Sequence, residues 1–306
     1  TDLADIDSFI CFTAISDDYL LARLIREKRA VRVYVYSWDH PCKHTCFSKR
    51  VKYACWSEPI REDIVSLQNI PIDQVLVTGA SQFCYIHDYR QREVLAPTRP
   101  YQYVYFGCAI GIPSLVSDEV RLVKILAETL GQVRPDWMLL VRPYPVLADW
   151  TLYEPLRQLP NVAFDEDFRT GDLSVQEEEI MKKYTTIERA EAFFHLGTTM
   201  GLEACFTETP SFILDFGYES ARGLSLYNFI HQFQNDRHLI NLAPQNAIAS
   251  KAELRAALEK LADPTFRQLN ERVQSQYHLR SFPEFSTRLV AADLVAGSET
   301  LRETRI

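Results

Sequence analysis

The chain has 306 residues, of which 47% are hydrophobic and 24% charged, and its formal net charge at pH 7 is −8. This composition is typical of a globular protein with one large domain or two ordinary ones. The negative charge argues against general nucleic-acid binding. No apolar run reaches the roughly 18 residues that a membrane-spanning helix needs, and the first residues lack the pattern of a signal peptide.

The first 86 residues predict strands that alternate with helices. Short β-rich runs are expected as strands, and runs with apolar residues at helical spacing are expected as helices. The predicted strands are 7–14, 31–40, 52–57 and 74–81, and the predicted helices are 17–29 and 58–69. A strand-helix-strand order makes a parallel sheet, and polar residues that follow its strands lie at the carboxyl edge, where open α/β sheets bind ligands.

A polar segment with two prolines, 87–100, predicts a linker between two domains. Further strands are predicted at 103–111, 136–145, 161–167, 190–197 and 211–216, and helices at 117–133, 177–190, 201–208, 251–263 and 282–297. We therefore divide the chain into 1–90, 91–283 and a C-terminal helix and tail, 284–306. Because only three or four strands precede the linker, against about six in a full doubly wound sheet, the first domain is expected to be incomplete.

One turn in the second domain has the composition of an anion site. Gly197, Thr198 and Thr199 open a helix that carries Gly201 and Glu203. The amides at a helix start are unpaired and lie at the positive end of the helix dipole, so the turn suits a phosphate. The threonine hydroxyls add donors, and a carboxylate one turn further along can accept a hydrogen bond from a ribose hydroxyl. The alternative is an ordinary capped helix, because Gly and Thr caps are common.

The cysteines predict reduced thiols. There are seven, an odd number, mostly in strand-like or core-like segments, which favours a cytoplasmic protein. One cluster alternates along the chain: His40, Cys42, His44 and Cys46. Alternation in a loop could place soft ligands around zinc. A second ligand pair at a usual spacing is missing from the sequence, so we do not expect a metal site there.

Four segments now bring a family into view: 37–40 (SWDH), 52–83, 141–145 (VRPYP) and 190–215. Together they resemble the GT-B glycosyltransferases of bacterial surface polysaccharide synthesis, and most of all CDP-glycerol glycerophosphotransferase-like and capsule-type Kdo transferase-like proteins. The resemblance extends over about residues 30–290. It implies an α/β, GT-B-like fold, in which two Rossmann-like domains face a cleft. The domain at 1–90 would then hold the acceptor, and the domain at 91–283 the nucleotide-activated donor.

The resemblance also implies donor-binding residues in the second domain. Thr198, Thr199 and Glu203 match the family's Ser/Thr pair and carboxylate. Arg142 and Tyr144 stand in a segment that usually reads Arg-Pro-His-Pro, where the histidine meets the donor's phosphate. A tyrosine can donate a hydrogen bond but carries no positive charge near pH 7. Arg142 could supply that charge, or it could be an ordinary solvated or salt-bridged strand-end residue.

A loop of the first domain matches a further donor motif. Gly79, Ser81 and Gln82 stand where relatives read Gly-Ser-Pro-Gln-Phe-Asp, and Cys84 replaces the acid of that motif. The alternative is a turn that simply leads into the linker. The departures at Tyr144 and Cys84 keep open the possibility that the chain binds its donor without catalysis.

Three residues are candidate catalytic bases. An inverting transferase needs a carboxylate or imidazole to take the proton of the acceptor hydroxyl. Asp39 stands where relatives read Trp-Asp-Asn, His40 is beside it, and Glu58 opens the next helix. Asp39 could equally cap the turn that follows it, and a helix start favours Glu in any case.

The sequence thus predicts a transferase of a sugar, or of a glycerophosphate-type group, that acts on a cell-surface glycan precursor. No cofactor or metal is expected, because GT-B enzymes stabilise the leaving phosphate with a helix dipole and basic groups. The pair Asp165 and Asp167 has metal-binding spacing but no supporting ligand. The expected partners are the donor, a glycan or lipid-linked acceptor and other polysaccharide-assembly proteins, in the cytoplasm or at the inner membrane face. Two alternatives remain, a UDP-sugar 2-epimerase and a catalytically inactive transferase-like binding protein.

Overall fold

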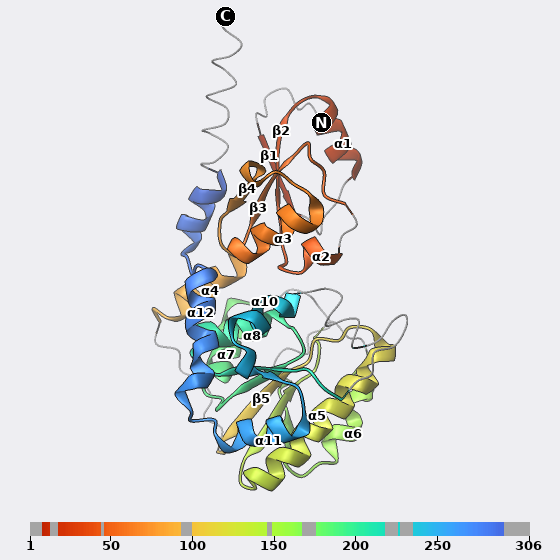
Figure 1. Ribbon diagram of the computed structural model, residues 1–306, viewed down its shortest axis with the longest axis vertical. Helices are drawn as coiled ribbons and strands as arrows, with labels where there is room; N and C mark the ends of the chain where they lie inside the picture. The colour runs from red at the N-terminus through yellow and green to blue at the C-terminus, as the bar shows by residue number, and fades with distance from the viewer. Residues whose placement is uncertain are drawn as a thin grey trace, which may run out of the picture. The chain divides into compact units, whose positions relative to one another are not determined.

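The computed structural model describes residues 8–12, 18–43, 46–92, 100–145, 149–166, 176–217, 226 and 235–290. The chain forms two compact units (Figure 1). Unit 1 contains residues 1–87 and 276–306, and unit 2 contains residues 88–275. Of the helices in the described ranges, none is both long and apolar enough to cross a membrane.

Unit 1 is built on a parallel sheet of four strands in the order β1-β2-β3-β4. The strands are β1 (Ser8–Phe12), β2 (Ala30–Tyr34), β3 (Lys52–Cys55) and β4 (Val75–Val77). The connecting helices are α1 (Asp18–Arg26), α2 (His40–Lys43), α3 (Glu58–Gln68), the short 3₁₀ helix η1 (Ile72–Gln74) and α4 (Ser81–Tyr89). Local chemistry sets their ends: α3 has Pro59 in its first turn and stops at Asn69, whose φ of 55° is left-handed.

The C-terminal segment packs on unit 1. A helix over 282–290 places the ring of Phe285 5.5 Å from that of Tyr34, and the ring of Phe282 4.9 Å from that of Tyr85. The Arg32 guanidinium donates a hydrogen bond to the Leu289 carbonyl at 3.1 Å. The sequence-based division at 283/284 therefore differs from the structure, in which unit 1 takes the chain from residue 276 onward. Nothing local in the amphipathic C-terminal helices indicates which sheet they cover.

Unit 2 is built on a parallel sheet of six strands in the order β10-β9-β8-β5-β6-β7. The strands are β5 (Tyr103–Gly107), β6 (Met138–Arg142), β7 (Val162–Phe164), β8 (Phe193–His195), β9 (Ser211–Leu214) and β10 (Ala247–Ile248). The α-helices are α5 (Pro113–Val133), α6 (Glu154–Arg157), α7 (Glu177–Glu188), α8 (Thr199–Phe206), α10 (Asn235–Leu242), α11 (Lys251–Glu259) and α12 (Gln268–Gln276). Three 3₁₀ turns complete the described part: η2 (Trp150–Tyr153), η3 (Pro244–Asn246) and η4 (Pro264–Arg267).

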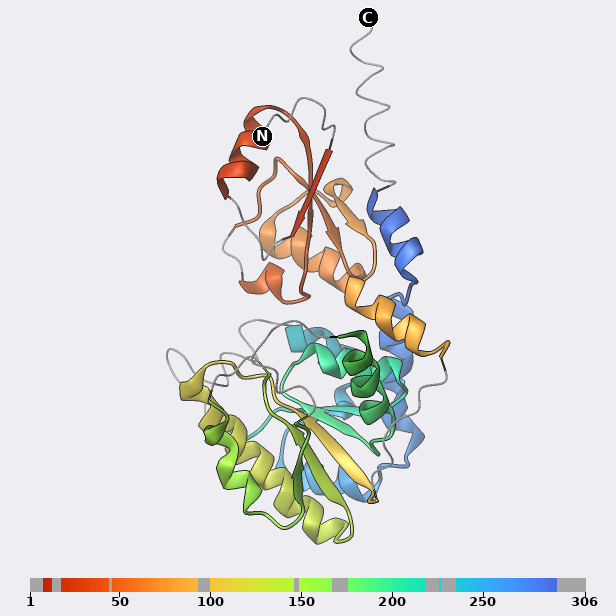
Figure 2. The same cartoon turned by 180° about the vertical axis from the view of Figure 1, so that it is seen from behind.

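Two helix layers cover the two faces of this second sheet (Figures 1 and 2). Successive side chains of a strand point to opposite faces, so each strand contributes side chains to both. On one face Val104, Phe106 and Val141 pack with apolar residues of α5 and α11. On the other face Tyr105 and Phe193 pack with residues of α7 and α8. Strands that are buried on both faces have near-continuous apolar sequences, and the strands of this sheet have such sequences.

The predicted strands of both units are confirmed, and so is the parallel α/β architecture. The differences lie where apolar periodicity is weak. The predicted linker begins too early, because α4 continues to Tyr89, and 93–99 lie outside the described residues. Helix α10 and the two-residue strand β10 are not predicted from sequence.

Candidate functional site

The strand order of unit 2 reverses between β5 and β8. From β5 the chain moves outward through β6 and β7, and then returns to place β8 against the other side of β5, with Gly107 opposite His195. In open α/β sheets ligands bind outside the carboxyl ends of the strands at such a switch point. Two loops leave the sheet there: 108–112 after β5 and 196–198 after β8. The hydroxyl-rich turn found in the sequence is therefore at the position that the topology favours.

The loop after β8 folds back onto His195. Nδ1 of this imidazole accepts hydrogen bonds from the backbone N–H groups of Gly197 at 2.9 Å and Thr198 at 3.3 Å. Gly197 has a φ of 85°, a left-handed conformation that turns both amides toward the ring. His195 is fully buried, and burial lowers the pKa of its imidazole to about 3. The ring is therefore neutral and holds its proton on Nε2.

This pairing corrects one expectation. The amides of Gly197 and Thr198 are not free for a phosphate, because His195 already accepts from both. The helix start also carries the hydroxyls of Thr198 and Thr199, two half-buried residues. Thr198 is the N-cap of α8: its hydroxyl accepts from the Met200 N–H at 3.4 Å and keeps its own proton to donate.

Gly201 is required by the same ring. A β-carbon at this position would lie 2.3 Å from Nε2 of His195, a distance no real contact allows. The first turn of α8 can therefore approach the imidazole only because residue 201 has no side chain. Gly201 thus has a packing role in the candidate site.

Glu203 lies one turn into α8 and is buried. Its Oε1 forms an ion pair with Nζ of Lys183 on α7, at 2.8 Å. Its Oε2 is buried and has no hydrogen-bond partner among the described residues. A buried ionised oxygen without a partner costs free energy, on the order of 1–3 kcal/mol or more. An acceptor of this kind can take one further hydrogen bond.

Arg142 belongs to the same buried layer. It ends β6, is 7% exposed, and lies close enough to Lys183 for its charge to lower the pKa of that ammonium, after burial as the main cause. Arg142 also hydrogen-bonds to the hydroxyl of Tyr105, which donates to Asp165. Burial, together with the charge of Asp165, raises the pKa of Tyr105 well above its ordinary value. Arg142 and Glu203 therefore both lie near Lys183. Their role in binding a donor stays a prediction.

A buried carboxyl group holds the loop after β5. Glu119 of α5 accepts hydrogen bonds from the backbone N–H of Ala109 at 2.8 Å and from the hydroxyl of Tyr153 at 3.1 Å. Burial raises the pKa of Glu119 to about 7. The ring of Tyr144 lies directly on this loop, since a β-carbon on Gly111 would be 2.7 Å from its Cε1. Tyr144 therefore lies beside the switch-point loop, half-exposed.

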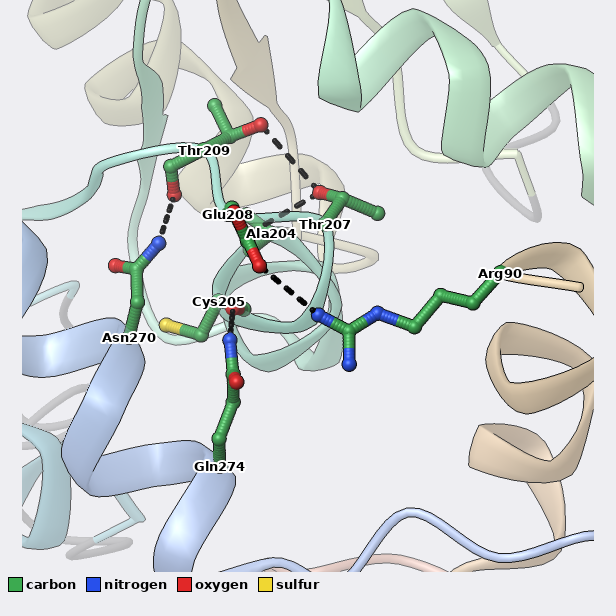
Figure 3. Close-up of polar contacts among 8 residues, drawn as sticks. All are labelled: Arg90, Ala204, Cys205, Thr207, Glu208, Thr209, Asn270 and Gln274. Atoms are coloured by element: carbon green, nitrogen blue, oxygen red, sulfur yellow. Dashed lines mark hydrogen bonds and ion pairs between the residues drawn. The ribbon is translucent and has the colours of Figure 1, made fainter.

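The far end of α8 is held by α12 and by the segment after α4 (Figure 3). Gln274 donates to the Cys205 carbonyl at 2.7 Å, and Asn270 donates to the Thr209 carbonyl at 3.0 Å. Arg90 forms an ion pair with Glu208, whose φ of 65° ends the helix. The C-terminal end of α8 and the residues after it are thus held by α12 and by Arg90, which follows α4 directly.

The three candidate bases lie in unit 1, at or after the carboxyl ends of its strands. Asp39 is 8% exposed, accepts from the Ser37 hydroxyl at 2.5 Å and pairs with Lys43. Burial opposes its ionisation, but Lys43 and Ser37 outweigh it, so the pKa of this carboxyl lies below its usual range. Its backbone carbonyl also accepts hydrogen bonds from the Cys42 and Lys43 amides of α2.

The other two bases are in open surroundings. His40 is half-buried, with its ring 6.4 Å from that of Tyr36. The carboxylate of Glu58 pairs with Arg61 in the first turn of α3 and is 46% exposed. Asp39 and His40 are neighbours, whereas Glu58 stands on another helix. As catalytic groups all three stay predictions.

The donor-site prediction is divided between the two units. Gly79, Ser81 and Gln82 belong to unit 1, and the remaining predicted residues belong to unit 2. Gly79 has a φ of 94° and leads into α4, whose first amide, at Ser81, donates to the Tyr34 hydroxyl at 2.9 Å. This contact gives the loop a structural role inside unit 1, and its role toward a donor stays a prediction.

The alternating histidines and cysteines at 40–46 are described only in part. In the described part of the chain no group of three or more His, Cys, Asp and Glu side chains is placed to hold a metal ion. His44 and Asp167 lie outside the described residues.

Sequence reasoning missed three residues that build this site. Lys183 and Glu119 read as ordinary charged positions of amphipathic helices, next to Lys182 and Asp118. His195 stands inside the quoted motif but received no role. Its place, at the end of a buried strand directly before Leu196 and Gly197, is the signal that could have indicated it.

No protein-family model matches the chain, and no curated protein matches its sequence. Its structure is similar to that of a proposed UDP-N-acetylglucosamine 2-epimerase from Listeria monocytogenes, with a TM-score of 0.58 and 11% identity over 95% of this chain and 75% of that one. It is also similar to UDP-GlcNAc 2-epimerase from Neisseria meningitidis bound to UDP-GlcNAc, with a TM-score of 0.52 and 11% identity over 98% of this chain and 78% of that one. WaaG, a glycosyltransferase involved in lipopolysaccharide biosynthesis, gives a TM-score of 0.46 and 15% identity over 92% of this chain and 81% of that one.

The first two similarities show a shared fold, and at these identities they show the fold alone. They confirm the predicted α/β, GT-B-like fold class with two Rossmann-like domains. The score of the third is too low to carry an argument.

Proposed function

We propose that unit 2 binds a nucleotide-activated donor at the switch point between β5 and β8, and that the protein transfers the donor's sugar, or a glycerophosphate-type group, to a cell-surface glycan precursor. The observation that carries the proposal is the orphaned Oε2 of Glu203. It lies one turn behind the hydroxyl-rich start of α8, so a ligand at that start can meet both an acceptor and several donors.

The phosphate is proposed to lie at the start of α8. The hydroxyls of Thr198 and Thr199 would donate to its oxygens, and the positive end of the helix dipole favours the anion by about 0.3–1 kcal/mol. Arg142 adds positive charge to the same layer, which compensates for the tyrosine that replaces a histidine at position 144. The carboxylate of Glu203 would accept a hydroxyl hydrogen of the ribose.

For a sugar, the chemistry is a substitution at the anomeric carbon. The acceptor's hydroxyl oxygen forms a bond to that carbon, the bond from the carbon to the phosphate oxygen breaks, and the nucleotide leaves with the electron pair. For a glycerophosphate-type group, the same oxygen forms a bond to the transferred phosphorus, the phosphoanhydride P–O bond breaks, and the nucleoside monophosphate leaves with the electron pair. The hydroxyl proton passes to a base. Of Asp39, His40 and Glu58, we favour His40, because Asp39 is committed to Ser37 and Lys43 and an imidazole ordinarily titrates near neutral pH.

We further propose that the reaction needs no metal, since α8 and Arg142 can stabilise the leaving phosphate. Activity that survives incubation with EDTA is expected, and activity that returns only on addition of a divalent cation would contradict this part. A lipid-linked acceptor would place the protein at the cytoplasmic face of a membrane, near other proteins of polysaccharide assembly.

A UDP-sugar 2-epimerase is the second candidate. The observation that favours it is the fold likeness to the Listeria protein and to the Neisseria enzyme bound to UDP-GlcNAc. Both candidates need the same nucleotide site. They separate in one assay: an epimerase converts UDP-GlcNAc with no acceptor present, whereas a transferase releases nucleotide only when an acceptor is supplied.

The nucleotide site is tested by thermal shift with CDP, CMP, UDP and GDP. At least one of them is expected to raise the melting temperature of the protein, and Glu203→Gln is expected to abolish the rise. Glu178→Gln removes an exposed carboxylate at the start of α7 and serves as the matched control. If the wild-type protein responds to none of the four nucleotides, the proposal fails. A response to nucleotide without turnover in either assay would favour a binding protein that has lost catalysis.

A further inference from the structure

Lys183 reaches Glu203 from the neighbouring helix. Its Nζ lies 2.8 Å from Oε1 of Glu203, and the two side chains are only 15% and 5% exposed. The ammonium also lies 4.7 Å above the centre of the Tyr184 ring, which adds a cation–π contact. Both charges are thus withdrawn from water and directed at one another.

Such a pair is costly to build and specific in its geometry. Burying two charges requires a large desolvation free energy, which their attraction offsets only when the arrangement is well fixed. Arg142 brings a second cation close to Lys183, where its charge adds to burial in lowering the pKa of the ammonium. The pair is therefore weak evidence for added stability and better evidence for a fixed position.

The consequence of the pair lies in the second oxygen of the carboxylate. A glutamate side chain has three rotatable bonds, and Lys183 holds it by Oε1. Oε2 is then left buried, without a partner among the described residues. A neutral hydroxyl is the donor that fits, because Lys183 and Arg142 already supply the positive charge of this layer.

We propose that Lys183 is a positioning residue, which fixes Glu203 so that its free oxygen accepts a ribose hydroxyl and makes the site distinguish ribonucleotides from nucleotides that lack these hydroxyls. This inference rests on the proposed nucleotide site. It assigns to Lys183 no contact with the ligand and no part in the chemistry.

The test is a set of binding titrations with UDP and CDP, each compared with its 2′,3′-dideoxy analogue. For the wild-type protein we expect the ribonucleotide that binds to be preferred by about tenfold or more, as for a hydrogen bond to a charged group. In Lys183→Met the preference should fall to about twofold, while the affinity for the dideoxy analogue stays within about twofold of wild type. Lys183→Arg should keep part of the preference, because it keeps the charge.

Lys182→Met is the matched control, since it removes the same charge from an exposed neighbouring position of α7. If Lys183→Met alone does not fold, the double variant Lys183→Met/Glu203→Gln replaces the whole pair by neutral groups. Such replacement of a buried ion pair is often tolerated. The double variant should fold and show no ribose preference.

The outcomes separate the two claims. An unchanged ribose preference in Lys183→Met, or in the double variant, overturns the role of Lys183 and leaves the nucleotide site standing. Equal binding of ribo and dideoxy forms by the wild-type protein overturns the role of Glu203 toward ribose and that of Lys183 with it. A wild-type protein that binds neither UDP nor CDP overturns the proposed function itself.

Discussion

Each of the two loops at the switch point of unit 2 is held by a buried side chain that accepts hydrogen bonds from backbone amides. One of these side chains is an acid and the other is a base. After β5, the carboxyl group of Glu119 accepts a hydrogen bond from the backbone amide of Ala109. After β8, the imidazole of His195 accepts hydrogen bonds from the backbone amides of Gly197 and Thr198. Both acceptors are fully buried, and burial disfavours the charged form of each. The pKa of Glu119 accordingly rises to about 7, whereas that of His195 falls to about 3.

This difference shows that two neutral acceptors can respond to pH in opposite directions. Glu119 is neutral when it holds a proton, so a rise in pH is expected to destabilise the loop after β5. His195 is neutral when it has lost one, so a fall in pH is expected to destabilise the loop after β8. The pH dependence of stability should therefore report the two loops separately.

The largest expected effect is acid destabilisation through His195. Its folded pKa of about 3 lies below its ordinary value of 6.5, so the unfolded chain binds the proton more readily. Its stabilising contribution is present above pH 6.5 and is lost as the pH falls toward 3. Since one pKa unit corresponds to about 1.4 kcal/mol, the loss approaches ~5 kcal/mol.

Urea denaturation at pH 7 and at pH 4 measures this loss. His195→Asn keeps an acceptor but does not titrate, and we expect the decline of its unfolding free energy toward acid to be several kcal/mol smaller than in the wild-type protein. Equal acid declines in the two proteins would show that the turn does not depend on the neutral ring.

Glu119 is expected to act in the reverse direction, by about 3 kcal/mol. Its folded pKa of about 7 lies above its ordinary value of 4.5, so the folded state binds the proton more tightly. The contribution is fully present below pH 4.5 and is lost as the pH rises through 7. The Glu119→Gln side chain stays neutral and keeps an acceptor for Ala109, so its contribution should not change with pH. Because the wild-type protein loses stability as Glu119 ionises, the unfolding free energy of the variant minus that of wild type should grow between pH 5 and pH 8. A difference that stays constant with pH would contradict the burial argument.

The smallest effect compares two glycines, one near each loop. Alanine at 201 meets the buried ring of His195 at 2.3 Å, and alanine at 111 meets the half-exposed ring of Tyr144 at 2.7 Å. Overpacking costs typically about 1–3 kcal/mol when the neighbour cannot move. We expect Gly201→Ala to lower the unfolding free energy by ~3 kcal/mol and Gly111→Ala by ~1 kcal/mol or less, because the ring of Tyr144 is less buried than that of His195 and can shift more easily. Equal losses in denaturation experiments would mean that the two loops are equally rigid.

The fold could be predicted from sequence because its determinants are local. Buried parallel strands such as 103–107 and 138–142 are continuous apolar runs, and the helices between them show a clear apolar periodicity. The return of the C-terminal segment to unit 1 could not be predicted in this way. It depends on contacts such as that of Arg32 with Leu289, which are far apart in the sequence.

The candidate site was predictable only in part. The turn at Gly197 and the carboxylate of Glu203 are visible as a pattern of small, hydroxyl and acidic residues. The capture of two amides by His195 is not, because it follows from the left-handed φ of Gly197. The burial of Lys183 and Glu119 was equally hidden, since a charged residue on an amphipathic helix is usually solvated.

Hydrogen–deuterium exchange of the backbone amides of 196–206, with and without millimolar UDP or CDP, tests the central claim most directly. We predict that one of these nucleotides slows exchange in the first turn of α8, and that it does so less in Glu203→Gln. Nucleotide binding detected by calorimetry with unchanged exchange in this segment would place the ligand elsewhere and contradict the account.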